Sequence, residues 1–197
     1  MSPEDPGYAL RLCEDTLSAS GRYALPGRNR VLYARCGAFS VVTGSEATRV
    51  VENQAWHGAG ACELEARGAG AAVLRYELIR GAVPLGEPAG ATRVLLEHAI
   101  DLDPRAEYLM RADRVDFAPG GVALPHRHRG GGIRCLIVGM LDVTVGDAPA
   151  RRVTPGGAWF ESGREPVLAS RRRTSPRASS GWPSSRASSA AARRSCT

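Results

Sequence analysis

The stretch from Gly120 to Gly163, GGVALPHRHRGGGIRCLIVGMLDVTVGDAPARRVTPGGAWFESG, decides the fold of this chain. It opens with two histidines one residue apart, His126 and His128, in a loop rich in glycine. An apolar run, a turn, a second run and a Pro-Gly turn follow, and this pattern predicts short β-strands. Because side chains along a strand alternate between its faces, we expect the two imidazoles to lie on one face.

The spacing of this stretch resembles the first motif of the cupin family. That motif is a glycine, five residues, His-x-His, then a glutamate three or four residues on and a further glycine. Gly120 and His126 bracket five residues, and His128 completes the pair. Gly132 and Ile133 stand where the glutamate belongs, so this chain departs from the family there. The resemblance implies an all-β fold, the double-stranded β-helix or jelly-roll barrel.

The chain also repeats itself over about 100 residues, which indicates a duplicated domain rather than a solenoid. The parallel segments are LPGRNR (25–30) with LPHRHR (124–129), VLYARCGAFSVVTG (31–44) with IRCLIVGMLDVTVG (133–146), and QAWHGAG (54–60) with GAWFESG (157–163). They align Gly37 with Gly139, Gly44 with Gly146 and Trp56 with Trp159. We expect the two tryptophans to pack at equivalent barrel positions. Gly27 and Asn29 replace the histidine pair in the first copy, so the second copy carries the His-x-His motif alone.

This repeat divides the chain into four predicted parts. They are a flexible N-terminal segment (1–24), a degenerate first cupin half (25–82), a second cupin domain (83–170) and an Arg/Ser tail (171–197). The N-terminal segment contains a weakly helical stretch from Pro6 to Leu17. In the second cupin domain, strands resume at residues 112–125 after a linker and a strand-like run. The tail is expected to be disordered because it has almost no aliphatic residues.

Two interpretations of the tail remain open. The repeat predicts a closing strand after residue 170, like the apolar run that ends the first half, so the tail could be the product of a shifted reading frame. Alternatively, it is a natural basic tail that binds nucleic acid or an anionic surface.

The charges of the chain are distributed unevenly. All 26 basic residues are arginine, which excludes a P-loop and a Schiff-base lysine. The formal net charge is +6, but residues 171–197 contribute seven arginines and no acid. Residues 1–170 therefore carry 19 basic and 20 acidic side chains. A nearly neutral body argues against a nucleic-acid-binding domain.

The sequence also bears on the compartment. The beginning, MSPEDPGYAL, is acidic and polar, unlike a signal peptide. No apolar run approaches the ~20 residues that would span a membrane. The five cysteines are widely spaced without a C-x-x-C pair, which argues against a zinc knuckle or a disulfide framework. We therefore expect a cytoplasmic protein with reduced thiols.

The histidine pair predicts a metal site. Two imidazoles that converge inside a barrel suit divalent Fe, Mn, Ni, Zn or Cu. The family's second motif would add another histidine, but Phe160 stands at that position. We therefore predict Glu161 as the third metal ligand beside His126 and His128. Weaker candidates are Glu97, His98, Asp116 and Cys135. His57 is expected to be a structural or surface histidine.

Two functions follow from the resemblance. One is a divalent-metal-dependent small-molecule enzyme, dioxygenase-like or isomerase-like, with a single site in the second half. The other is a non-catalytic, metal-free cupin that binds or senses a ligand, which the two departures from the family motifs favour. Arg134 is expected to bind a substrate carboxylate if its side chain points into the barrel. By analogy with cupins that pair through barrel edges, we also expect a homodimer.

Overall fold

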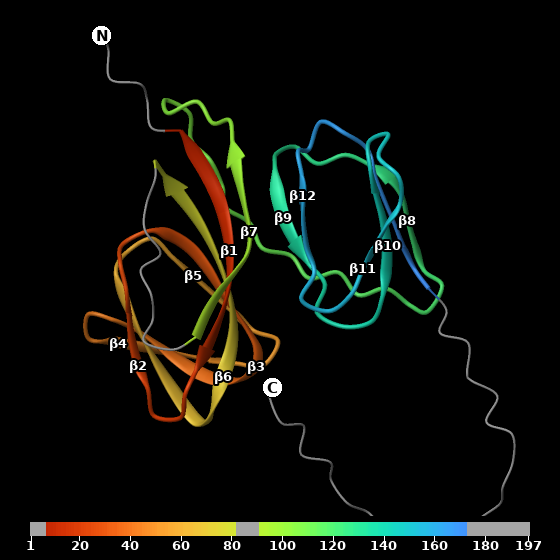
Figure 1. Cartoon of the computed structure of the whole chain (residues 1–197). Helices are drawn as coiled ribbons and strands as arrows, with labels where there is room; N and C mark the ends of the chain where they lie inside the picture. Colours follow the sequence, from red (N-terminus) through yellow and green to blue (C-terminus); the bar gives the residue numbers. More distant parts are fainter. Residues whose placement is uncertain (1–6, 82–90, 173–197) are drawn as a thin grey trace, which may run out of the picture.

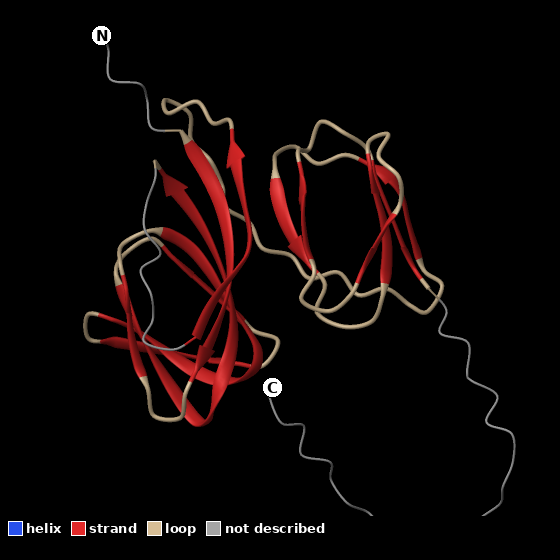
Figure 2. Cartoon of the chain, viewed as in Figure 1, coloured by secondary structure: helices blue, strands red, loops and turns tan. Residues whose placement is uncertain are grey.

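The computed structural model describes residues 7–81 and 91–172 of the chain. All regular structure in these residues is β-strand, so the prediction of an all-β fold is confirmed (Figure 2). None of the described elements is a helix that could cross a membrane. Most of the predicted tail, residues 173–197, lies outside the described residues.

The strands fall into two groups along the chain. Those of the first group are β1 (Tyr8–Leu17), β2 (Arg22–Leu25), β3 (Asn29–Thr43), β4 (Glu46–Val51), β5 (Ala55–Gly58), β6 (Cys62–Arg80) and β7 (Ala91–Ile100). Those of the second are β8 (Val122–His126), β9 (Gly132–Cys135), β10 (Leu141–Val145), β11 (Arg151–Val153), β12 (Ala158–Glu161) and β13 (Val167–Arg171). We refer to residues 7–81 with β7 as the first half, and to residues 101–172 as the second half.

The two halves differ in how completely their strands are joined. In the first half, a seven-stranded sheet runs β4-β3-β6-β1-β7, with β2 on β6 and β5 on β3 (Figure 1). In the second half, a four-stranded sheet runs β11-β10-β13-β8, and a separate two-stranded sheet pairs β12 with β9. The first half is thus one continuous curled sheet, and the second is a sandwich of two.

The prediction of a flexible, weakly helical N-terminal segment is wrong for Tyr8–Leu17. This stretch is β1, which pairs antiparallel with β6 on one side and with β7 on the other. The physical reason is that both of its faces are covered. Leu12 packs on the outer face, while Cys13 and Leu17 are buried on the inner one. The leucines that suggested a helix therefore lie on both faces of a strand, Leu10 and Leu12 on one and Leu17 on the other.

The prediction that strands resume at residues 112–125 is correct only for the last part. β8 begins at Val122, and residues 101–121 form no strand. Several of their apolar side chains are exposed, with Leu109 at 87% and Val115 at 72%. Side chains so exposed gain nothing from a pleated, half-buried surface, which is what stabilises a strand.

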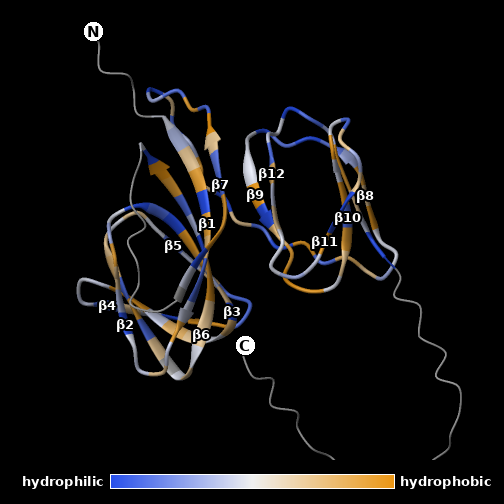
Figure 3. Ribbon diagram, viewed as in Figure 1, coloured by the Kyte–Doolittle hydropathy of each residue, from blue (hydrophilic) through white to orange (hydrophobic). Residues whose placement is uncertain are grey.

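Three apolar clusters hold the described residues together, and Figure 3 shows apolar and polar residues alternating along their strands. The first fills the inside of the first half, and Trp56 packs against it. The second fills the second half, where Trp159 packs against it. The third joins the two halves around the buried side chains of Leu12, Leu74 and Ile133, which come from β1, β6 and β9. The two-stranded sheet of β9 and β12 therefore packs with one face on the outside of the first half.

The glycines aligned by the repeat have matching backbone conformations. Gly37 and Gly139 have φ angles of 75° and 89°, and Gly44 and Gly146 have φ angles of 59° and 58°. Such left-handed values favour glycine because a side chain would be strained there. At Gly37 a Cβ atom would also lie 2.3 Å from the carbonyl oxygen of Gly70. The strands of both halves thus turn at corresponding points.

Among the described cysteines, Cys13, Cys62 and Cys135 carry free thiols, as expected. Cys36 is disulfide-bonded, so the expectation of reduced thiols is wrong at that position.

Candidate functional site

The wall of the candidate site is the inner face of the two-stranded sheet of β9 and β12. Arg134 is opposite Trp159 in the antiparallel register, and Gly132 is opposite Glu161. Because neighbouring residues face opposite ways, these side chains point into the second half, whereas Ile133 belongs to the cluster that packs on the first half. The expectation that Arg134 points into the barrel agrees with this placement.

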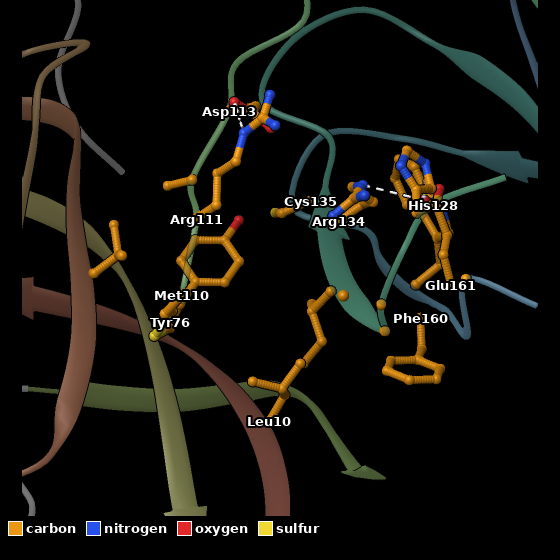
Figure 4. A pocket seen from close by; sticks show the side chains of 18 of the residues that line it. Leu10, Tyr76, Met110, Arg111, Asp113, His128, Arg134, Cys135, Phe160 and Glu161 are labelled. Carbon is orange, nitrogen blue, oxygen red and sulfur yellow. Dashed lines mark hydrogen bonds and ion pairs between the residues drawn. The ribbon is translucent and has the colours of Figure 1, made fainter. Parts of the chain in front are cut away.

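Glu161 is the buried centre of this wall, with only 3% of its surface exposed. Its Oε1 accepts a hydrogen bond of 2.8 Å from the indole nitrogen of Trp159. Its Oε2 lies 3.0 Å from Nε2 of His128 and 3.2 Å from Nε of Arg134. Neither contact to Oε2 has the alignment of a hydrogen bond, so this oxygen lies beside the charged guanidinium of Arg134 and keeps room for a donor. Figure 4 shows the side chains of His128, Arg134 and Glu161 together.

The two histidines meet although the strand ends between them. His126 is the last residue of β8, and His128 lies in the loop beyond it. The rings lie edge to face, with their centroids 4.9 Å apart. Nδ1 of His126 is 2.8 Å from the carbonyl oxygen of Leu124, so Nε2 is the nitrogen that faces away from the backbone. The sequence thus predicted the proximity of the pair and of Glu161 to His128.

These groups line one cavity of about 1320 Å³ that extends from inside the second half to the outer face of the first. Apolar walls come from both halves, including Leu10 and Tyr76 on one side and Phe160 on the other (Figure 4). Burial raises the pKa of the Tyr76 phenol. Burial, and secondarily the charge of Glu14, raises the pKa of the Cys135 thiol to about 11. Both groups are therefore neutral at physiological pH.

The weaker ligand candidates all lie in other contacts. Glu97 accepts a hydrogen bond of 2.7 Å from Arg11, and His98 stacks on Phe160 with ring centroids 3.7 Å apart. Asp116 pairs with Arg114 at 2.9 Å, and Cys135 packs in the cluster between the halves. The exposed His57 lies on β5 and lines the cavity from the first half.

As they are arranged, the residues do not fit a metal ion. No group of three His, Cys, Asp or Glu side chains in residues 7–81 and 91–172 is placed to hold one. Arg134 adds a positive charge 3.2 Å from the carboxylate that a metal would need. Nε2 of His128 faces that same carboxylate instead of pointing with His126 toward a common centre.

The corresponding interior of the first half holds an ionic network that the sequence analysis missed. Arg75 donates two hydrogen bonds to Asp15, at 2.7 and 3.1 Å, and a third to Glu77 at 2.8 Å. Arg30 donates to the other oxygen of Glu77 at 3.2 Å. All four side chains are fully buried. Arg75 and Glu77 alternate with apolar residues in VLRYELI, which was the available signal that they share the inner face.

Comparison with known proteins supports the fold alone. No family model matches the chain, and no curated protein does. An oxalate decarboxylase mutant from Bacillus subtilis has a TM-score of 0.56 at 11% identity, covering 86% of this chain and 70% of that one. AerE from Microcystis aeruginosa has a TM-score of 0.56 at 8% identity, covering 85% and 88%. A cupin 2 conserved barrel domain protein from Leptotrichia buccalis has a TM-score of 0.49 at 13% identity, covering 87% and 80%.

Proposed function

Because the chain has the cupin fold that its two-histidine motif indicated, we propose that its second half binds a small organic carboxylate without a metal ion. The observation that carries the proposal is the position of Arg134. Its guanidinium lies on the wall of the cavity, and only its Nε is engaged with Glu161.

The guanidinium of Arg134 has donors to spare. The side chain is 39% exposed, and among the described residues its two terminal nitrogens have no hydrogen-bonding partner. A planar guanidinium binds a carboxylate through two parallel hydrogen bonds, which fix the orientation of the ligand. Glu161 keeps the guanidinium in place from behind while leaving its outer edge to the ligand.

The histidines supply the second side of the proposed site. His128 is held by Glu161, and His126 by the carbonyl group of Leu124. Nδ1 of His128 and Nε2 of His126 are then the nitrogens left for a second polar group of the ligand. The apolar walls suit a ligand with a hydrocarbon or aromatic portion, since binding pockets combine apolar surface with a few fixed polar groups.

The proposal is tested by titrating the purified chain with acetate and oxalate in the presence of a chelator, by calorimetry. The wild type is expected to bind at least one of them. Arg134→Gln should weaken that binding about 10–100-fold, since a hydrogen bond to a charged group contributes about 1.5–3 kcal/mol. Arg151→Gln, which removes an exposed arginine of β11 outside the cavity, is the matched control. Absence of saturable binding, or equal losses in both variants, would overturn the proposal.

A second candidate is the divalent-metal-dependent enzyme with His126, His128 and Glu161 as ligands. One observation favours it, namely the 3.0 Å approach of Glu161 to His128, with an oxygen that has room for another partner. The metal content of purified wild type and of the double variant His126→Ala/His128→Ala decides between the two. Stoichiometric metal that is lost in the double variant favours the enzyme, and its absence from the wild type excludes this candidate.

A further inference from the structure

The edge of β9 and the exposed residues 108–117 lie on either side of the cavity, and we infer that together they form a docking groove for an extended peptide strand. The occupant to which we commit is a strand of about ten residues with alternating apolar side chains, added to β9 by backbone hydrogen bonds. Strand addition of this kind is a common mode of peptide recognition.

The first half contains the template for this arrangement. Residues 71–80, the second part of β6, pair with β1 on one side and with the beginning of β3 on the other. The first part of β6, beginning at Cys62, pairs with β2 and with the end of β3. In the second half, β13 makes the equivalent pairs with β8 and β10. It is the counterpart of the first part of β6 alone, since it ends at Arg171.

The sequence identifies the counterparts of the two strands that flank residues 71–80. The repeat aligns β9 with the beginning of β3. Residues 108–117 align with β1, because Tyr108, Met110 and Arg111 match Tyr8, Leu10 and Arg11 at the same spacing. The segment YLMRADRVDF therefore has the pattern of a strand, although it forms none in the structure.

Both sides of the groove offer what an added strand needs. On β9, the N–H of Leu136 donates to the carbonyl of Gly157 beside β12. Because successive amides alternate, those of Ile133 and Cys135 face the other edge, which pairs with no strand in the described residues. An unpaired edge of this kind is a template for another strand.

The opposite side of the groove, residues 108–117, exposes apolar side chains and is bonded to the first half. Leu109 and Val115 expose 87% and 72% of their surfaces, and Tyr108 exposes 53%. Arg114 ties this segment to the first half through a hydrogen bond of 3.3 Å to the hydroxyl of Tyr33. Figure 4 shows Met110 and Arg111 across the cavity from Cys135 and Arg134. An exposed apolar patch of this kind marks an interaction site.

The pattern of the template defines the partner. In AAVLRYELIR, residues 71–80, Leu74 and Tyr76 point to the outer face while Val73 and Arg75 point inward. The printed sequence after β13, from Arg172 onward, contains two prolines and one large apolar residue, Trp182, and does not follow this pattern. The expected occupant is therefore a separate peptide that alternates as residues 71–80 do.

The test uses the full chain and a fluorescein-labelled peptide of the sequence AAVLRYELIR, followed by fluorescence anisotropy. Saturable binding is expected, and a peptide with proline in place of its central leucine and tyrosine should bind at least about ten-fold more weakly, since proline removes backbone donors. Val115→Asp should weaken binding by a similar factor. Leu124→Asp, an equally exposed site outside the cavity, is the control.

Hydrogen exchange locates the bound peptide independently of any variant. The amides of Ile133 and Cys135 should become protected, while those of β4 stay unchanged. Equal binding of both peptides, equal losses in both variants, or self-association of the chain that prevents peptide binding would overturn the proposal. The last result would assign the groove to a second copy of the chain. Peptide binding is read out through the amides of β9 and through Val115→Asp, whereas carboxylate binding is read out through Arg134→Gln, so the groove and the proposed function succeed or fail separately.

Discussion

The interiors of the two halves contain similar charged side chains in opposite circumstances. In the first half, Asp15, Arg75 and Glu77 are fully buried and bonded to one another. In the second half, the carboxylate of Glu161 is as deeply buried, but its partner Arg134 remains 39% exposed at the edge of a large cavity. One interior is closed by its ion pairs, and the other leaves them at the edge of a cavity.

A buried ion pair is therefore not by itself a binding site. Burial of charges costs free energy that only a complete set of hydrogen bonds offsets, and the first half has such a set. Its network consequently leaves no donor for a ligand. In the second half, the wall around Glu161 satisfies the carboxylate from one side only. The remaining donors of Arg134 and of the two histidines face the cavity.

The largest expected effect is on the stability of the first half. Arg75→Met should lower the free energy of unfolding by about 3–5 kcal/mol, because Asp15 would stay buried without Arg75 and Glu77 would lose one of its hydrogen bonds. Urea unfolding followed by circular dichroism measures this. Arg22→Met, which removes an exposed pair with Glu63, should cost less than about 1 kcal/mol. Similar costs in both variants would contradict the distinction between a closed and an open interior.

The second effect is the loss of stability in acid. Burial alone would raise the pKa of Glu77, but the charges of Arg75, Arg30 and Arg28 outweigh it and hold the pKa below the usual 4.5. The unfolded state therefore binds this proton first, and the stabilisation is complete above pH 4.5 and is lost as the pH falls through the folded value. Urea unfolding between pH 6 and pH 3 should show a shallower decline for Glu77→Gln than for the wild type. Parallel curves would argue against the network.

The third effect concerns the second half. A Cβ atom at Gly132 would lie 2.7 Å from Nη1 of Arg134, the far end of a flexible side chain. Gly132→Ala should therefore displace the guanidinium and weaken oxalate binding about five-fold, or about 1 kcal/mol, with little change in unfolding. Gly130→Ala, where a Cβ atom would meet nothing within 4 Å, is the matched control. Unchanged oxalate affinity in Gly132→Ala would mean that Arg134 does not hold the ligand.

The fold was predictable from local signals. The backbone conformation was predicted by short alternating runs, by glycines at repeated positions and by the His-x-His spacing. Gly139 and Gly146 indeed have φ angles close to those of Gly37 and Gly44 in the first half. The helix expected at Pro6–Leu17 is wrong because its few apolar positions do not distinguish a helical from a strand period: Leu10 and Leu12 share one face of the strand, and Leu17 lies on the other. Only the pairing partners, β6 and β7, decide between them, and these lie far along the chain.

The sequence predicted that Glu161 lies close to the histidines, but it did not predict the contact between Glu161 and Arg134. Glu161 was expected near the histidines because it follows Phe160, which stands at the histidine position of the family's second motif. That its carboxylate would be compensated by Arg134 depends on which residue of β9 lies near it, and a strand register is set by the whole sheet. The network around Arg75 was missed for a similar reason, since its partners come from three different strands.

The most direct test of a metal-free carboxylate site is the oxalate affinity of Glu161→Gln relative to the wild type, measured by calorimetry on chelator-treated protein. The glutamine keeps an oxygen for the indole of Trp159 but removes the negative charge that repels a carboxylate bound beside Arg134. The variant should therefore bind oxalate more tightly, by about three-fold to ten-fold. Loss of binding in the variant, or binding by the wild type only after a divalent metal is added, would contradict the account.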